Sequence, residues 1–312
     1  MSAAKRIDRL SSVRSGWREI RRHWVVFGLG VVFPLAVYVA FVGYPIAYTV
    51  YLSFQEWDGF SSVVHSVGLR NYQDLAHDPN FWQSFRNTIK WTIGTLFFTN
   101  VLAFLLAVVL RSKRVYFGTF LRLFFFIPVT MSLVAIGLMF SFILTPAFGA
   151  LDQIAQAFGF SSGPDLLGDP NTALYTLIAV FGWSYFGIPL ILFDAGLTQI
   201  PQELYESARL EGANAFQQLR FVTLPILKPI FMVVTVLAVL EALRAFDLVL
   251  VMTRGGPGHA SDTLGYLMWI QSFDERRFGY GAAISTVMLL MSSVFAIIYV
   301  RRAGRDALGG RD

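Results

Sequence analysis

The chain of 312 residues contains no cysteine. Disulfide bonds and thiolate metal sites are therefore excluded, and cysteine usage leaves the redox compartment undetermined. Lysine is also scarce: there are four, and none follows a glycine, which excludes a phosphate-binding P-loop. The four histidines are scattered through the tail and loops without the spacing of metal ligands. We therefore expect no catalytic residue, no metal site and no cofactor bound by this chain.

Charge is in short supply as well. Charged residues make up 14% of the chain and hydrophobic residues 55%, whereas soluble domains carry about 25% charged residues. Aromatic residues reach 16%, with 30 phenylalanines, which suits lipid-facing surfaces and interfacial belts. The net charge of +5 does not predict a nucleic-acid partner, because the cations lie in short connections between apolar runs. The composition predicts an all-α integral membrane protein in contact with lipid.

Six apolar stretches are long enough to cross a bilayer, for which about 20 residues suffice. We expect transmembrane helices at about 25–53, 88–110, 118–145, 172–197, 226–252 and 279–300. A transmembrane domain over 25–300 then lies between an N-terminal tail, 1–24, and a C-terminal tail, 301–312. Prolines fall inside these spans, where neighbouring helices satisfy the freed carbonyl groups; among them are Pro34, Pro45, Pro128 and Pro189.

The distribution of Lys and Arg predicts the orientation in the membrane. The N-terminal tail has seven, the 111–122 turn four, the 198–228 loop three and the C-terminal tail four. The alternate connections have two before residue 88, none in 146–171 and three between 253 and 278. The asymmetry predicts that both termini and the 198–228 loop lie in the cytoplasm.

That loop is a polar stretch between two apolar spans, and local rules predict two short helices in it. Pro201 suits a first helical position and Gly212 a C-terminal cap. Asn214 can cap the second helix, with Gln217 as its capping-box partner. Read by itself, the stretch is a solvated helix-turn-helix loop.

The spacing within the loop resembles a family motif. Glu206-Ser207-Ala208, Gly212, Val222 and Leu224-Pro225 match the pattern Glu-Ala-Ala, three residues, Gly, nine residues, Ile, any residue, Leu-Pro. This pattern marks the membrane subunits of binding-protein-dependent ABC importers. The chain departs from it by Ser207 for Ala and Val222 for Ile.

Other segments extend the resemblance to the sugar-type branch, which includes the maltose and glycerol 3-phosphate permeases. They are Gly68–Leu75 with Asp78-Pro79, Asn87-Thr88, Phe246-Asp247 with Gly255-Gly256-Pro257, and Gly279–Ser285. The chain lacks the extra N-terminal spans and the large outer domain of the longer maltose subunit.

The resemblance implies a type I ABC importer permease fold with six spans in a bacterial or archaeal cytoplasmic membrane. It also implies a second permease subunit, two ATPase subunits that bind ATP and Mg, and an extracytoplasmic binding protein. The 198–228 loop would be the coupling helix that docks on an ATPase subunit. The residues expected to carry this contact are Glu206, Ser207, Ala208, Glu211, Gly212 and Ala213.

Charged residues at the end of the fifth span offer a candidate substrate path. Glu241, Arg244 and Asp247 are successively three residues apart, so we expect them to share one helix face. Charges in a bilayer usually face a bundle interior or a wet cavity, and these side chains would bind sugar hydroxyl groups by charge-assisted hydrogen bonds. A mutually neutralising structural trio is the alternative.

The resemblance to the maltose permease adds further positions to this path. It implies that Ser184, Phe186, Gly187 and Leu190, from the fourth span, and Ala238 and Ala242, from the fifth, lie near substrate. Ordinary helix packing is the alternative. The outer loop 146–171 either meets the binding protein or only connects two spans.

We therefore predict the permease subunit of an ATP-driven importer for a di- or oligosaccharide or a related polyol, with ATP hydrolysis on partner subunits. A glycerol-phosphate-type permease is the nearest alternative. A stand-alone secondary transporter would require inverted repeats, which the sequence does not show, and a structural scaffold would need no loop of fixed spacing.

Overall fold

The computed structural model describes residues 28–111 and 117–308, which are almost entirely helical. The N-terminal tail, 1–24, lies outside the described residues. Contacts divide the chain into two units, Met1–Leu52 and Ser53–Asp312. In the first unit, α3 (Phe33–Tyr38) and α4 (Tyr44–Leu52) are joined by a π-helical turn. They form one apolar helix, Gly30–Leu52, that is long enough to cross a membrane.

The second unit begins with a small hairpin and a short helix. Strands β1 (Gln55–Glu56) and β2 (His65–Ser66) pair antiparallel, and α5 (Arg70–His77) follows. The buried Asn71 amide donates to the carbonyl oxygens of Ser53 and Gln55, both at 2.9 Å. These bonds fix α5 against the base of the hairpin.

The second span is longer than expected. Helix α6 (Pro79–Leu96) continues through a π-helical turn into α7 (Ala103–Leu110) as one long helix. It begins at Pro79 rather than near residue 88, because the Asp78 side chain accepts from the Asn80 amide and Pro79 occupies the first turn.

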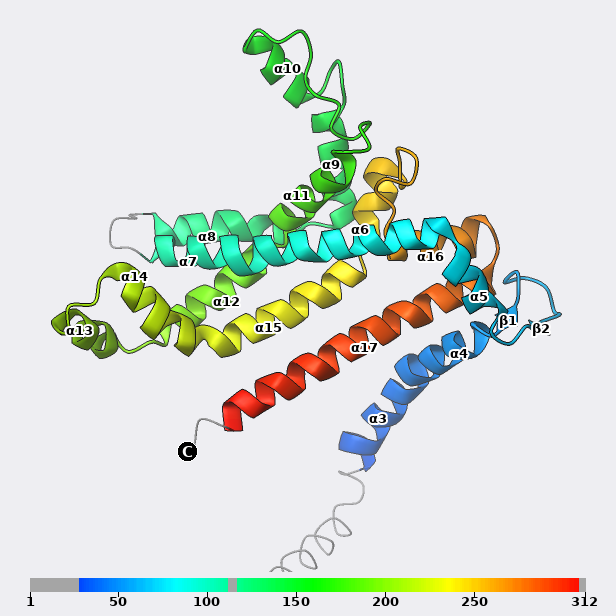
Figure 1. Cartoon of the computed structure of the whole chain (residues 1–312), viewed down its shortest axis with the longest axis horizontal. Coiled ribbons are helices and arrows are strands. Elements are labelled where there is room, and N and C mark those ends of the chain that lie inside the picture. Colours follow the sequence, from blue (N-terminus) through cyan, green and yellow to red (C-terminus); the bar gives the residue numbers. More distant parts are fainter. Residues whose placement is uncertain (1–27, 112–116, 309–312) are drawn as a thin grey trace, which may run out of the picture. The chain divides into compact units, whose positions relative to one another are not determined.

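The third and fourth spans are each broken. Helix α8 (Gly118–Phe126) and a 3₁₀ turn to Thr130 meet α9 (Leu133–Leu144) at 101°, and Figure 1 shows α9 leaving the line of α8. Helices α11 (Ala173–Tyr185) and α12 (Gly187–Thr198) meet at 46°. Proline clashes with the carbonyl group four residues earlier, so Pro189 accounts for the bend after Tyr185. The short α10 (Ala150–Ala157) lies between the two broken spans.

The fifth span differs from its expected bounds of 226–252 at both ends. Helix α15 (Leu224–Leu243) joins α14 (Ala215–Gln218) through a π-helical turn, giving one helix from Ala215 to Leu243. Pro225 lies in the first turn of α15, where its missing N–H breaks no hydrogen bond. After Leu243 the chain leaves the helix, and the freed Ala245 carbonyl accepts a hydrogen bond from the Thr263 hydroxyl at 2.6 Å.

The last two helices are α16 (Leu264–Trp269) and α17 (Phe278–Leu308). A buried amide joins the loop before α16 to α6: Asn87 Nδ2 donates to the carbonyl oxygens of Ala260 and Asp262 at 3.0 Å and of His259 at 3.4 Å. The Thr88 hydroxyl accepts from the Leu264 amide at 2.9 Å. The Asn87-Thr88 segment therefore meets residues 259–264, which follow Gly255-Gly256-Pro257 in the sequence.

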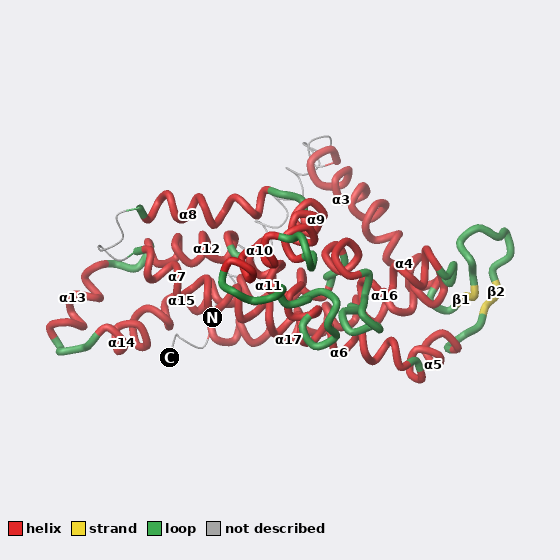
Figure 2. Tube along the Cα trace, turned by 90° about the horizontal axis from the view of Figure 1, so that it is seen from above, coloured by secondary structure: helices red, strands yellow, loops and turns green. Residues whose placement is uncertain are grey.

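Within the described residues, four unbroken helices are long and apolar enough to cross a membrane, and six spans result if each bent pair counts as one. In the second unit, α13 (Gln202–Leu210) and α14 lie at one end with the end of α7 and the C-terminal end of α17; we call this the loop end (Figures 1 and 2). The hairpin and α5 lie at the opposite, hairpin end (Figure 2). Near the loop end, the rings of Phe104, Phe193 and Phe231 pack on one another at 4.5–5.4 Å.

Candidate coupling loop and substrate path

The expected coupling loop folds into two short helices joined by a tight turn. Helix α13 covers Gln202–Leu210, with Pro201 as its N-cap rather than its first residue. The Gly212 amide donates to the Arg209 carbonyl at 3.0 Å, and the Ala213 amide to the Ala208 carbonyl at 2.9 Å. This is a Schellman cap, which requires the positive φ of +83° that Gly212 adopts.

The second short helix, α14, has the expected capping box. Asn214 Oδ1 accepts from the Gln217 amide at 2.9 Å, and Gln217 Oε1 accepts from the Asn214 amide at 2.8 Å. The Tyr205 hydroxyl lies 3.0 Å from that of Thr223, which ties α13 to the turn that begins the fifth span. The helix of the fifth span therefore begins within the loop, at Ala215, and not near residue 226 as expected.

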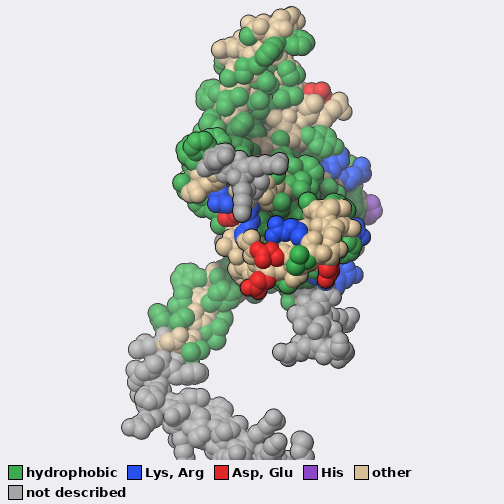
Figure 3. Space-filling view, turned by 90° about the vertical axis from the view of Figure 1, so that its left-hand side faces the viewer, with side chains coloured by type: hydrophobic (Ala, Val, Ile, Leu, Met, Phe, Trp, Pro, Cys, Tyr) green, Lys and Arg blue, Asp and Glu red, His purple; other side chains and the backbone are tan. Residues whose placement is uncertain are grey.

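The loop presents the expected contact residues at the surface. Glu206, Ser207, Glu211 and Gly212 are exposed, and Ala208 and Ala213 are half-buried. Among the described residues, no hydrogen bond or ion pair holds the side chains of Glu206 and Glu211. The view onto the loop end shows acidic and basic side chains gathered there (Figure 3).

Sequence reasoning missed two apolar members of this surface. Leu210 is 90% exposed and Phe216 68% exposed, on either side of the Gly212 turn. An exposed pair of large apolar side chains in a polar loop is typical of a protein-binding surface. In the sequence, the signal for this surface was Leu210 and Phe216 on either side of the Glu211-Gly212 turn.

The charge trio of the fifth span is not on one helix face, contrary to expectation. Helix α15 ends at Leu243, Arg244 is its C-cap, and Asp247 lies beyond the break at 244–246. The Thr263 hydroxyl donates to the Ala245 carbonyl, which the end of the helix leaves free. The periodicity of the sequence could not reveal this hydrogen bond. Arg244 Nη2 still lies 3.7 Å from Glu241 Oε1, a partly exposed pair.

Most of the other residues expected along the substrate path are packed inside the subunit. Ser184, Gly187, Leu190, Ala238 and Ala242 are buried within the subunit. The Ser184 hydroxyl donates to the Phe181 carbonyl at 2.8 Å, and Phe186 is half-buried with its ring 5.5 Å from that of Phe125. The charged side chains of Glu241, Arg244 and Asp247, by contrast, all remain partly accessible.

Tyr185 was not singled out from the sequence. Its ring stacks on Phe181 with centroids 5.6 Å apart and planes 8° apart. Tyr185 also packs against the core cluster that contains Ala242 and Ala245, the sequence neighbours of Glu241 and Arg244. The structure thus brings together an aromatic face, a carboxylate and a guanidinium, a combination that binds sugars through stacking and hydrogen bonds. A tyrosine directly after Ser184, in a span otherwise rich in phenylalanine, was the available signal.

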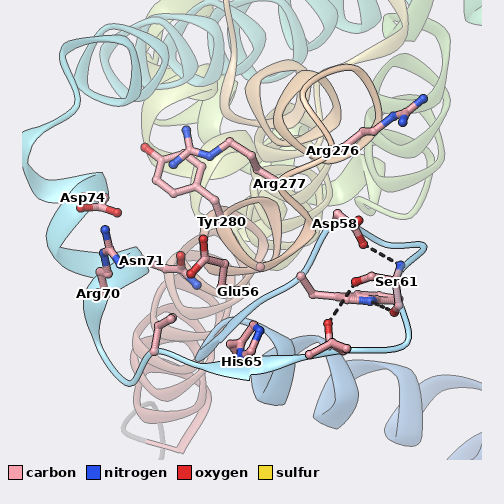
Figure 4. A pocket seen from close by; sticks show the side chains of 14 residues that line it. Glu56, Asp58, Ser61, His65, Arg70, Asn71, Asp74, Arg276, Arg277 and Tyr280 are labelled. Carbon is pink, nitrogen blue, oxygen red and sulfur yellow. Dashed lines mark hydrogen bonds between the residues drawn. The ribbon is translucent and has the colours of Figure 1, made fainter.

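A polar pocket of about 500 Å³ opens at the hairpin end. Figure 4 shows its wall built by the hairpin, α5 and the first turn of α17. Both charge signs line it, with Glu56, Asp58, Asp74, Arg70, Arg276 and Arg277 among the lining residues. The Arg277 guanidinium lies 4.4 Å from the Tyr280 ring centre and donates to Gln271 at 3.2 Å.

The hairpin tip is held by Asp58. Its Oδ1 accepts from the Ser61 amide at 2.7 Å (Figure 4) and from the Phe60 amide at 3.0 Å. These hydrogen bonds stabilise the ionised form and lower the pKa of Asp58 from 3.8 to about 2. Among the described residues, no group of three or more His, Asp or Glu side chains is placed to hold a metal ion.

Comparison with known proteins identifies the class. Residues 99–304 match the family model of the binding-protein-dependent transport system inner membrane component. The match covers more than half of the chain, so the chain belongs to this family. It is a multi-pass membrane protein, the permease component of an ABC transport system, and the sequence-based identification is confirmed.

Individual relatives agree with this membership. The chain is 35% identical to the probable ABC transporter permease protein YurN of Bacillus subtilis, over 86% of this chain and 92% of that one. It is 31% identical to the arabinooligosaccharides transport system permease protein AraP of the same organism, over 93% of each.

Solved structures share the fold. A bacterial ABC transporter involved in import of the acidic polysaccharide alginate matches with a TM-score of 0.80 at 18% identity, covering 93% of this chain and 98% of that one. A bacterial alginate ABC transporter in complex with an alginate pentasaccharide-bound periplasmic protein matches with a TM-score of 0.78 at 18% identity, covering 91% of this chain and 95% of that one. The expected all-helical type I permease fold is confirmed.

Proposed function

We propose that this chain is the permease of a carbohydrate importer, working with a second permease subunit and two ATPase subunits that bind and hydrolyse ATP with Mg. Curated relatives named for arabinooligosaccharides and for multiple sugars support a di- or oligosaccharide substrate or a related polyol. A glycerol phosphate is the second candidate, favoured by the guanidinium of Arg244 beside the path. This chain then binds no cofactor of its own.

The observation that carries the proposal is the capped loop at the loop end. A Schellman cap and a capping box hold it in one shape, while its carboxylates and large apolar side chains remain exposed. Such a preorganised surface docks without losing much conformational freedom. ATP-driven closure of the ATPase subunits then moves α13, and α12 on one side and the helix Ala215–Leu243 on the other carry the motion into the spans.

Substrate meets the Tyr185, Glu241 and Arg244 side chains on its way through the membrane. The ring of Tyr185 offers a stacking face, and the charged pair offers acceptors and donors to hydroxyl groups. Asp247, beyond the break, contributes a further carboxylate. Positions buried in the subunit's own core, such as Leu190 and Ala238, act by shaping the backbone rather than by touching sugar.

The polar pocket at the hairpin end receives the extracytoplasmic binding protein. Its lining of guanidinium and carboxylate groups suits a partner surface with charges of both signs. The 198–228 loop and the C-terminal end of α17 lie at the opposite, loop end, which supports a cytoplasmic position for that end. The seven Lys and Arg residues of the N-terminal tail support the same side for that terminus, in a bacterial or archaeal cytoplasmic membrane.

Reversal of the Glu206 charge tests the coupling surface. In reconstituted complexes, Glu206→Lys is expected to insert normally but to lose sugar-stimulated ATPase activity and transport. Glu275→Lys, at an exposed glutamate outside the loop, is the matched control and should retain both. Unchanged ATPase stimulation and transport in Glu206→Lys would overturn the assignment.

A further inference from the structure

Each of the two broken spans carries a single charged residue, and these two residues pair with each other. Arg122 is the only charge in Gly118–Leu144, and Asp194 the only one in Ala173–Thr198. Arg122 Nη2 lies 2.9 Å from Asp194 Oδ1, with 29% and 21% of the side chains exposed. Because charges are costly in a bilayer, a matched pair between otherwise apolar spans indicates a contact with a specific role.

The ion pair belongs to a small polar network near the loop end. The Thr198 hydroxyl donates to the Asp194 carbonyl at 2.8 Å and accepts from Arg111 Nη1 at 3.0 Å. Arg111 caps α7, Arg122 lies on α8, and Asp194 and Thr198 lie on the last turns of α12. The network therefore joins three helices one turn inside the loop end.

Apolar packing holds α8 less firmly than it holds its neighbours. Helix α8 has no fully buried residue, and three of its large apolar side chains are exposed: Phe120, Leu123 and Phe124. Leu121 and Phe125 pack at the margin of the core that α7 and α12 share. The ion pair therefore adds a polar link to an attachment of α8 to α12 that otherwise rests on a few partly buried side chains, including the Phe125–Phe186 ring contact.

The position of α12 next to the coupling helix explains why its attachment to α8 matters for coupling. Only Gln199, Ile200 and Pro201 separate Thr198 from α13, so α12 receives any displacement of the coupling helix directly. We propose that the Arg122–Asp194 ion pair is a positioning contact that makes α8 move with α12. Displacement of α13 then reaches the broken third span as well as the fourth. This inference rests on the proposed docking of α13 on an ATPase subunit.

The test uses reconstituted full complexes and measures substrate imported per ATP hydrolysed. Asp194→Asn is expected to lower this ratio about threefold or more. Arg122→Lys, which keeps the charge, and the exchanged pair Arg122→Asp with Asp194→Arg should each keep most of the parent ratio. Arg122→Met with Asp194→Leu retains apolar volume without the pair. That double variant should assemble and remain uncoupled.

A second readout follows the two helices themselves. Because the chain has no cysteine, spin labels can be placed at the exposed Thr119 on α8 and Gln202 on α13. In the parent complex the distance between them should stay constant between the nucleotide-free and ATP-bound states. In Asp194→Asn it should change with nucleotide, because α8 no longer follows.

The outcomes separate this inference from the proposed function. A normal transport ratio in Asp194→Asn and in the apolar double variant, or a failure of both Arg122→Lys and the exchanged pair to restore it, overturns the positioning role. The Glu206→Lys variant reports on docking of α13 by itself. Uncoupling by Glu206→Lys together with normal coupling in the Asp194 variants would leave the proposed function standing and remove the ion pair from it.

Discussion

The hydroxyl oxygen of Tyr205 lies 3.0 Å from the hydroxyl oxygen of Thr223. Tyr205 is on α13, whereas Thr223 ends the π-helical turn that leads into α15. Thr223 is buried and Tyr205 half-buried, so water competes poorly for this bond. The coupling helix is thus attached to the fifth span by a side-chain bond in addition to the chain itself.

Removal of this bond is expected to loosen the loop without unfolding the protein. Tyr205→Phe deletes one hydrogen bond, worth about 0.5–1.5 kcal/mol, and should lower the amount of sugar imported per ATP hydrolysed. The matched control is Tyr72→Phe, which removes a hydroxyl–hydroxyl contact of 2.6 Å with Ser53 at the hairpin end. A normal ratio in Tyr205→Phe would show that the bond is not used in coupling.

The turn after α13 depends on glycine at one position. Gly212 has φ +83°, and no atom lies within 4 Å of the place that a Cβ would take, so alanine there meets backbone strain of about 1–2 kcal/mol but no clash. Gly212→Ala should reduce sugar-stimulated ATPase activity, and Gly212→Asn should retain more of it because asparagine tolerates this conformation.

The control for that substitution is Gly258→Ala. Gly258 has φ +56° and equally open surroundings, but it lies in the loop before α16 rather than in the coupling loop. An equal loss of coupling in the two alanine variants would mean that general backbone strain, and not the shape of the coupling loop, is responsible.

The Tyr185 hydroxyl is expected to contribute to substrate affinity. Tyr185→Phe keeps the ring on Phe181 and removes one hydrogen-bonding group, so the KM for transport should rise about 2- to 10-fold. Tyr299→Phe is a close control, since Tyr299 also stacks on a phenylalanine four residues earlier, with centroids 5.3 Å apart. A KM unchanged from the parent in Tyr185→Phe would remove this residue from the path.

The hairpin tip should depend on ionised Asp58. The pKa of about 2 lies below the usual 3.8, so the carboxylate stabilises the tip above pH 3.8, and this contribution is lost as the pH falls towards 2. Asp58→Ala should speed amide hydrogen exchange in residues 57–66 at neutral pH. Asp58→Asn should retain protection, because its side-chain oxygen still accepts, and should also lack the acid-dependent loss.

The sequence was a good guide wherever local chemistry decides the outcome. The Gly212 cap and the Asn214–Gln217 capping box were both predicted and confirmed, since each involves residues a few positions apart. The apolar runs predicted six crossing segments, and the bend at Pro189 has a local cause. The early start of α6 is also explained locally, by Asp78-Pro79. The apolar run begins about ten residues later and does not indicate it.

Long-range partners explain what could not be predicted. The end of α15 depends on Thr263, which is 18 residues from the Ala245 carbonyl that it holds. Because α15 ends before Asp247, the periodicity of one unbroken helix does not apply to the trio. The pairing of Arg122 with Asp194 joins different spans. Each is the only charge in its span, but no local pattern shows that the two residues face each other.

The Asn87 amide has a consequence for how the protein is made. Its partner carbonyl groups at residues 259–262 lie more than 170 positions later, with a separation of 175 to Asp262. At about 5–20 residues per second, α6 is synthesised many seconds before those partners exist. Until then a polar side chain that ends up 1% exposed must be satisfied by water or by other proteins. The hairpin end is therefore complete only after residues 259–262 have been synthesised. In a chain truncated before residue 255, α6 would lack the carbonyl groups that bind the Asn87 amide.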